Sequence, residues 1–166
     1  MVRTYSIFLI FLLLVGCAVQ TKQAEPVEPV DSNSFLAQPF SYPLTLQYFQ
    51  EEKKDDFKLR RFIRTLGSDT TRKDTIYKFS RKKDSYLFYK TRDHKSFFLT
   101  ATLKNKQTHF RGGLHPGMKK TEFMKQITGI TSAEDTLKIQ SSERQAIFIF
   151  GKSGQLTEIQ LNNYFK

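Results

Sequence analysis

The chain of 166 residues has one cysteine, three histidines and no tryptophan. A single cysteine excludes a disulfide within the chain and a cysteine-rich metal site. The histidines, His94, His109 and His115, have neither helical i,i+4 spacing nor neighbours at the spacing of metal ligands. The sequence also lacks a glycine-rich phosphate loop and a GxSxG nucleophile elbow. We therefore expect no enzyme activity, no catalytic residues, no cofactor and no metal.

Long apolar runs are also scarce, and the one clear run, residues 7–15, lies close to the amino terminus after MVRTYS. A resident membrane helix needs about 20 apolar residues, so this run is typical of a secretory signal instead. The tetrapeptide Leu14-Val15-Gly16-Cys17 resembles the bacterial lipobox. It predicts a lipoprotein signal peptide over residues 1–16 and a Cys17 that carries thioether lipid and palmitate. The alternative is an ordinary signal peptide with an incidental cysteine.

Residues 17–40 have three prolines and no periodic apolar pattern, which predicts a lipidated cysteine followed by a flexible tether. Ala18, and not aspartate, follows the cysteine. By resemblance to enterobacterial lipoproteins this residue favours anchoring in the outer membrane, facing the periplasm. The predicted location is therefore the bacterial cell envelope, and the first predicted partner is the membrane that holds Cys17.

Residues 41–166 are long enough for one domain with a core of its own. Positive charge is concentrated in its first half, because residues 57–111 carry sixteen Lys and Arg against four Asp, a net charge of +12. Such a field attracts polyanions. An exported protein rarely meets nucleic acid, so we expect an anionic lipid or a protein partner and no nucleic acid. A simpler alternative is that the cations keep an exposed sheet soluble and block pairing at its edge.

The apolar patterns predict an α+β domain. Residues 43–49 are interpreted as a strand, and residues 59–66 as a helix with its apolar stripe at i, i+3, i+4 and i+7. A second short helix is expected between Met118 and Gly129. Alternating or continuous apolar residues predict the strands. Their ranges are 76–80, 85–91, 97–103, 136–140, 146–150 and 156–163. These elements indicate a single antiparallel sheet with short helices on one face.

The two halves of the domain also resemble each other. Residues 62–79 align with residues 123–140 without a gap and share four identities in eighteen positions. Residues 98–105 then fall on residues 156–163. This predicts two degenerate helix-plus-three-strand repeats, at about residues 55–111 and 112–166.

Within residues 113–160, one order of motifs is notable: a Gly-Met pair, a short helix, a glycine, a strand, a Ser-Gly turn and a Leu-Thr-x-Ile segment. The residues that carry it are Gly117, Met118, Gly129, Gly154 and Leu156. This order resembles the SmpA/OmlA-type lipoproteins, small accessory proteins of the outer-membrane β-barrel assembly machinery. The duplicated helix-plus-hairpin unit also resembles the architecture of the β-lactamase inhibitor proteins. Both resemblances imply helices laid over a single antiparallel sheet, with the five residues in packing and turn roles.

We therefore predict a lipid-anchored binding module of the envelope with an accessory role in outer-membrane assembly or integrity. One alternative is an anchored inhibitor or toxin-immunity protein. Another is a binder of anionic glycolipid through the basic first repeat. The candidate residues for contact with a partner or an anionic ligand are Lys82, Lys83, Arg92, Lys95, Tyr86 and Phe88.

Overall fold

The computed structural model describes residues 28–66, 69–130 and 134–164. The predicted signal peptide and Cys17 lie outside these residues. None of the helices in the described ranges has the length and apolar character needed to span a membrane.

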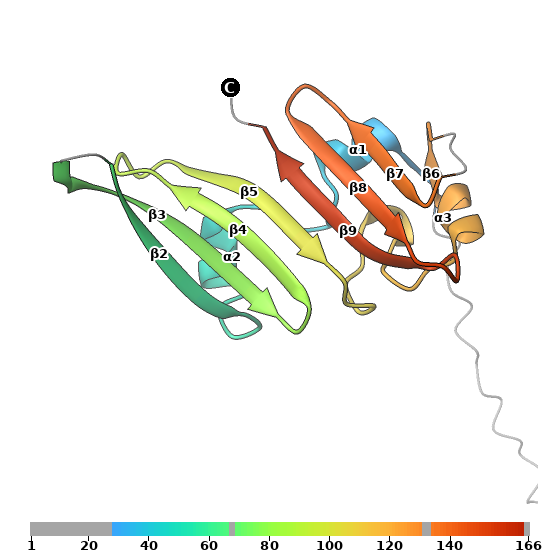
Figure 1. Cartoon of the computed structure of the whole chain (residues 1–166), viewed down its shortest axis with the longest axis horizontal. Coiled ribbons are helices and arrows are strands. Elements are labelled where there is room, and N and C mark those ends of the chain that lie inside the picture. Colours follow the sequence, from blue (N-terminus) through green and yellow to red (C-terminus); the bar gives the residue numbers. More distant parts are fainter. Residues whose placement is uncertain (1–27, 67–68, 131–133, 165–166) are drawn as a thin grey trace, which may run out of the picture.

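The described chain is built on a seven-stranded antiparallel sheet (Figure 1). From one edge to the other, its strands are β2 (Lys58–Leu66), β3 (Asp69–Arg81), β4 (Asp84–Lys90), β5 (Ser96–Leu103), β9 (Leu156–Asn163), β8 (Arg144–Phe150) and β7 (Thr136–Gln140). The centre of the sheet is the β5–β9 pair, which joins the first half of the chain to the second.

Short helices and a small two-stranded sheet complete the fold. They are α1 (Ser32–Ala37), α2 (Leu46–Glu51), α3 (Lys120–Gln126), the 3-10 turn η1 (Arg111–Gly113), and the parallel pair of β1 (Val30–Asp31) and β6 (Ile127–Thr128). The predicted class, α+β with a single antiparallel sheet and short helices, is confirmed.

The core lies between the sheet and these helices. One row of side chains crosses the sheet by cross-strand pairing and is buried at every strand from β3 to β7. It consists of Phe79, Tyr86, Ala101, Leu161, Ala146 and Ile139. Aromatic rings from the helices pack on this face: Phe49 of α2 lies 4.7 Å from Tyr86, and Phe123 of α3 lies 4.7 Å from Phe148. Burial of this aromatic layer favours folding, because it removes a large apolar area from water.

The six predicted strands are confirmed within β3, β4, β5, β7, β8 and β9, but two predictions near the start of the domain were wrong. Residues 59–66 form strand β2, not a helix, and the segment predicted as a strand contains helix α2. Thr45 accepts a hydrogen bond from the Tyr48 backbone N–H at 3.3 Å and so caps α2. The apolar residues of 59–66 have helical spacing, but the segment forms a strand because it pairs with β3. Phe62 lies opposite Ile76 and Ile63 lies opposite Thr75 in this pair.

The folded part also begins earlier than residue 41. Helix α1 follows Asp31, whose carboxylate accepts from the Ser34 backbone N–H at 2.9 Å. Phe35 and Phe40 are fully buried and their rings pack against Phe110. The predicted tether is therefore wrong from about residue 30 onward, since these residues contribute to the core.

The proposed alignment of the two halves is wrong over its helical part. It matches Phe62 of strand β2, which is 50% exposed, with Phe123 of helix α3, which is buried. The alignment of β5 with β9 does agree in burial: Phe98 matches Leu156 and Leu103 matches Leu161, and all four are buried. The β4–β5 and β8–β9 pairs also each contain one register shift, at Phe88 and at Phe150.

Candidate binding surface

Two of the predicted contact residues belong to the core. Tyr86 is 1% exposed and Phe88 is fully buried, and both pack against the ring of Phe49 beneath helix α2. Their prediction as surface contacts was wrong. Alternate residues of a strand point to opposite faces of the sheet. In β4, Tyr86 and Phe88 point toward the core, whereas Leu87 and Tyr89 point outward.

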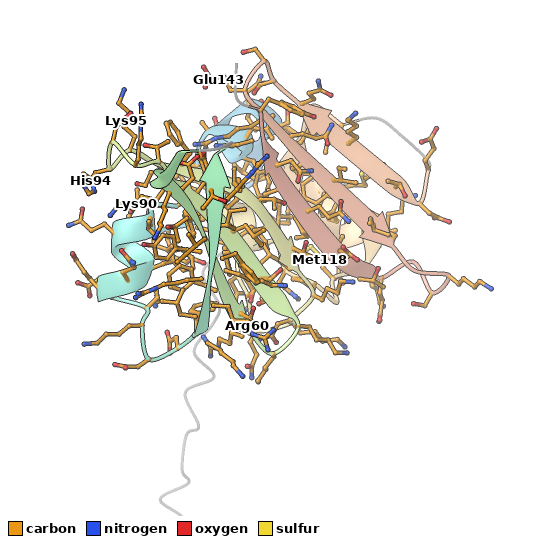
Figure 2. All side chains as sticks on the ribbon, turned by 60° about the vertical axis from the view of Figure 1, so that its left-hand side comes forward. Arg60, Lys90, His94, Lys95, Met118 and Glu143 are labelled. Atoms are coloured by element: carbon orange, nitrogen blue, oxygen red, sulfur yellow. The ribbon has the colours of Figure 1, made fainter. Side chains whose placement is uncertain are left out.

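The four predicted cations do not form one patch. Lys82 and Lys83 lie in the turn before β4, whereas Arg92 and Lys95 lie in the turn after it. A seven-residue strand separates the two turns by roughly 20 Å. Figure 2 shows Lys95 toward one end of the sheet and Arg60 toward the other. The Lys82 Nζ donates to Gln107 at 3.0 Å, and the Arg92 Nε lies 3.4 Å from the Asp93 carboxylate.

The sheet face that points away from the helices carries an apolar row across the first four strands, which the sequence analysis missed. Phe62, Ile76, Tyr89 and Phe97 are successive cross-strand partners on β2, β3, β4 and β5. Phe62 is 50% exposed and Phe97 is 36% exposed. We call the outward side chains of β2–β5 the open face. Within the described residues no helix covers it (Figure 1).

Cations border this row on the open face. On one side of it, Arg60 of β2 lies opposite Lys78 of β3 in the strand register, and on the other side Arg64 lies opposite Asp74. Asp74 is nearly buried, because it accepts the Tyr89 hydroxyl and, at 3.2 Å, the Arg92 backbone N–H. The hydrogen bond to Asp74 raises the pKa of Tyr89 above the ordinary value of a phenol. The open face thus combines apolar side chains with arginines whose charge Asp74 does not fully balance.

Strand β2 forms one edge of the sheet and is its most basic strand. Lys58, Arg60, Arg61 and Arg64 lie on it, and it contains no acidic residue. The Arg61 guanidinium lies 5.7 Å from the Tyr77 ring centre, a cation–π contact. Ile63, on the face opposite to Phe62, is 68% exposed. Strand β3 pairs with β4 only from Thr75 onward, so the outer parts of β2 and β3 extend beyond β4 as a two-stranded ribbon.

The structure brings together four of the five motif residues of the second half. The Gly117 N–H donates to the Leu156 carbonyl at 2.6 Å, and the Leu156 N–H donates to the Met118 carbonyl at 2.8 Å. The Lys120 N–H donates to the Gly154 carbonyl at 2.8 Å, which fixes the start of α3 on the β8–β9 turn. Met118 and Leu156 are buried. Because these side chains are buried, the cluster is a packing motif and not a contact surface.

Gly129, the fifth motif residue, lies elsewhere. It follows β6 with a φ of +84°, and a Cβ at this position would lie 2.9 Å from the Ser32 Oγ of α1. The residue therefore lets the β6 end approach the start of α1. Ser32 belongs to the segment predicted as a tether, so this part of the segment packs against the domain.

A polar pocket that contains several titratable groups lies between the α2–β2 loop, the β3–β4 end of the sheet and the loop after β5. Its lining includes Lys53, Arg81, Asp56 and Asp84, so positive and negative charges are equal in number. Asp84 accepts from the backbone N–H groups of Lys104 and Asn105 at 2.8 and 2.9 Å and from the Thr108 hydroxyl. These bonds fasten the loop after β5 and leave the carboxylate no free oxygen for catalysis.

Two tyrosines at the same pocket also lack the properties of a catalytic base. The hydroxyls of Tyr42 and Tyr86 lie 3.2 Å apart. Burial raises the pKa of Tyr42 to about 12, and burial raises the pKa of Tyr86 as well. Both phenols are therefore protonated at neutral pH. Their role is to hold the segment before α2 against β4.

The three histidines separate into a pair and a single residue. The rings of His109 and His115 lie 5.2 Å apart, whereas His94 lies in the β4–β5 turn with a φ of +63°. In the described residues, no group of three or more His, Cys, Asp or Glu side chains has a geometry that could hold a metal ion. Comparison of the chain with protein-family models, curated proteins and solved structures gave no match.

Proposed function

We propose that this protein is a lipid-anchored bacterial envelope protein that acts by binding a protein partner, without catalysis. The open face is the observation that carries the proposal. It joins an exposed apolar row to several arginines and lysines. Such a combination is typical of protein interaction surfaces, in which apolar and aromatic residues and arginine are enriched.

Anchoring is the part of the proposal that the amino-terminal sequence supports. The short apolar run of residues 7–15 and the tetrapeptide that ends at Cys17 fit a lipoprotein signal. Acyl chains contribute roughly 0.8 kcal/mol per buried CH₂, so two or more chains hold a protein on a membrane for long periods. The proposed location is the outer membrane, with the domain in the periplasm.

We further propose that the sheet arose from two related units, β3–β5 and β7–β9, each with a helix. The matched burial of Phe98 with Leu156 and of Leu103 with Leu161 supports this, as do the two register shifts at Phe88 and Phe150. A duplicated unit is expected from the resemblance to the β-lactamase inhibitor proteins, whereas the resemblance to SmpA/OmlA-type lipoproteins concerns the second unit alone. That resemblance also favours an accessory role at the barrel-assembly machinery over other envelope functions.

The glycolipid alternative loses its original basis, because the four predicted cations lie in two separated turns. An inhibitor or immunity role remains the main competitor. An inhibitor or immunity protein would use the same open face. It would bind one soluble partner, and this binding would not depend on the lipid anchor. The two functions therefore differ in their partners and in the effect of Cys17.

Photo-crosslinking in the protein's own membranes tests the proposal. A photoreactive residue replaces Leu87, which lies on the open face, and in a control replaces Lys152, which lies in the β8–β9 turn. Each photoreactive variant is made in the full-length chain in two forms, one with Cys17 and one with the substitution Cys17→Ser that removes the anchor. We expect barrel-assembly components to be crosslinked from position 87 only, and only with the intact anchor.

The other outcomes contradict specific parts of the proposal. A single soluble protein crosslinked with either form of the anchor would support the inhibitor or immunity function instead. Crosslinks to lipid alone would support the glycolipid alternative. Equal yields from positions 87 and 152 would show that the open face has no partner.

A further inference from the structure

Strand β2 is the longer of the two edge strands. It has nine residues, against five in β7 at the opposite edge, and its outer side pairs with no other strand in the described part of the chain. An unpaired edge presents backbone N–H and C=O groups to any strand that approaches. Proteins protect such an edge by making it short, by covering it or by placing charged side chains on it, and only the last of these applies to β2. Here it is long and uncovered.

The side chains of β2 favour an extended partner on this edge. Phe62 is 50% exposed on the open face, and Ile63 is 68% exposed on the other face. An added strand would lie beside both residues, because successive side chains of β2 point to opposite faces. A cation-covered edge whose only task is solubility would not need two adjacent exposed apolar residues.

Charge selects the kind of strand that fits. Arg60 and Arg64 flank Phe62 on the open face, and Arg61 lies on the other face. None of these three forms an ion pair with a carboxylate among the residues whose side chains are described. Opposite charges on paired strands contribute favourably, whereas like charges directly opposite each other are destabilising.

The same charges disfavour a second copy of this chain in the register centred on Phe62. If two β2 strands paired antiparallel about Phe62, Arg60 of each copy would face Arg64 of the other. Two such contacts of like charge would oppose the dimer. An acidic strand instead places carboxylates opposite both arginines.

We propose that the free edge of β2 binds an extended acidic segment of a partner protein, which pairs antiparallel and adds a strand to the sheet. This inference rests on the proposed binding function and names how the partner is held. Carboxylates of the segment lie opposite Arg60, Arg61 and Arg64, and small apolar side chains lie opposite Phe62 and Ile63. Backbone hydrogen bonds supply affinity, and the charge pattern supplies selectivity.

The test uses a synthetic peptide with this pattern, TEVVEET, and the full-length chain in detergent micelles. Hydrogen exchange reports on the β2 amides, and fluorescence anisotropy of the labelled peptide gives its dissociation constant. We expect peptide binding to slow exchange in β2 and not in β7. The double variant Arg60→Glu and Arg64→Glu should bind at least tenfold more weakly, whereas Lys138→Glu on edge strand β7 should change binding less than twofold.

A second peptide separates strand pairing from simple charge attraction. It has the same side chains but N-methyl groups on alternate backbone nitrogens along the edge that would face β2. Loss of binding supports strand addition. Equal binding of both peptides, or no protection of the β2 amides, would overturn the proposal. Crosslinking from position 87 would still test the binding function by itself, so the two can fail separately.

Discussion

At the scale of single residues, buried polar groups determine where the loops of this protein lie. Asp84 is only 3% exposed and accepts three hydrogen bonds from the loop after β5. A buried carboxylate is tolerated when its oxygens are satisfied in this way. The sequence alone shows an aspartate beside two lysines in a turn, which is typical of a solvated residue.

We expect Asp84→Ala to lower the free energy of unfolding by about 3 kcal/mol, because two part-buried backbone N–H groups and one hydroxyl lose their acceptor. Urea denaturation followed by circular dichroism measures this loss. The control is Asp93→Asn. The Asp93 carboxylate is exposed and forms a surface ion pair with Arg92, so this change should alter stability by less than about 0.5 kcal/mol. Similar losses in the two variants would show that the Asp84 bonds contribute little.

At the scale of elements, short helices depend on the sheet. Helix α2 has only six residues, fewer than a helix needs to be stable alone in water. Its Phe49 lies within 5.5 Å, between ring centres, of Phe57, Phe79, Tyr86 and Phe88. The helix therefore exists because this ring fills the centre of the first half's core.

Phe49→Ala should lower the free energy of unfolding by about 3–5 kcal/mol, since it removes a large buried side chain and leaves a cavity. Gln47→Ala is the matched control on the same helix, because Gln47 is exposed and its side-chain amide donates to the nearby Glu51 carboxylate at 3.2 Å. Its effect should stay within about 0.5 kcal/mol. The midpoints of urea denaturation compare the two, and a small loss for Phe49→Ala would mean that α2 contributes little to the core.

At the scale of the whole molecule, residues 30–40 complete the core, although their sequence is typical of a linker. Residues 30–40 contribute β1, α1 and three buried apolar side chains, Phe35, Leu36 and Phe40. The Arg144 guanidinium of β8 donates to the Leu36 carbonyl at 3.0 Å and to the Ala37 carbonyl at 2.5 Å. The segment thus covers the second half of the sheet.

Two truncated chains test this role. A chain that starts at residue 28 should unfold cooperatively, whereas one that starts at residue 41 should lack a stable fold. Each lost side chain contributes about 1.5–3 kcal/mol of burial, and together they approach the whole stability of a typical domain. Thermal denaturation by circular dichroism compares the two chains. Equal midpoints would restore the interpretation of residues 30–40 as a tether.

Local patterns were enough to predict much of the second half. The alternation in residues 136–140 and 156–163 and the turn residues Ser153 and Gly154 predict their strands directly, because each forms next to its neighbour in sequence. The open face could not be predicted in this way. Its apolar row joins Phe62, Ile76, Tyr89 and Phe97, which become neighbours only when four strands pair.

The amino-acid sequence by itself determined the antiparallel α+β class, the positions of six strands and the concentration of positive charge in the first half. These are properties of short segments or of composition, which do not depend on distant contacts. Tertiary structure decided that residues 59–66 form a strand and that residues 30–40 join the core. In both cases a short apolar segment has no strong preference of its own, and the partner on which it is buried fixes its conformation.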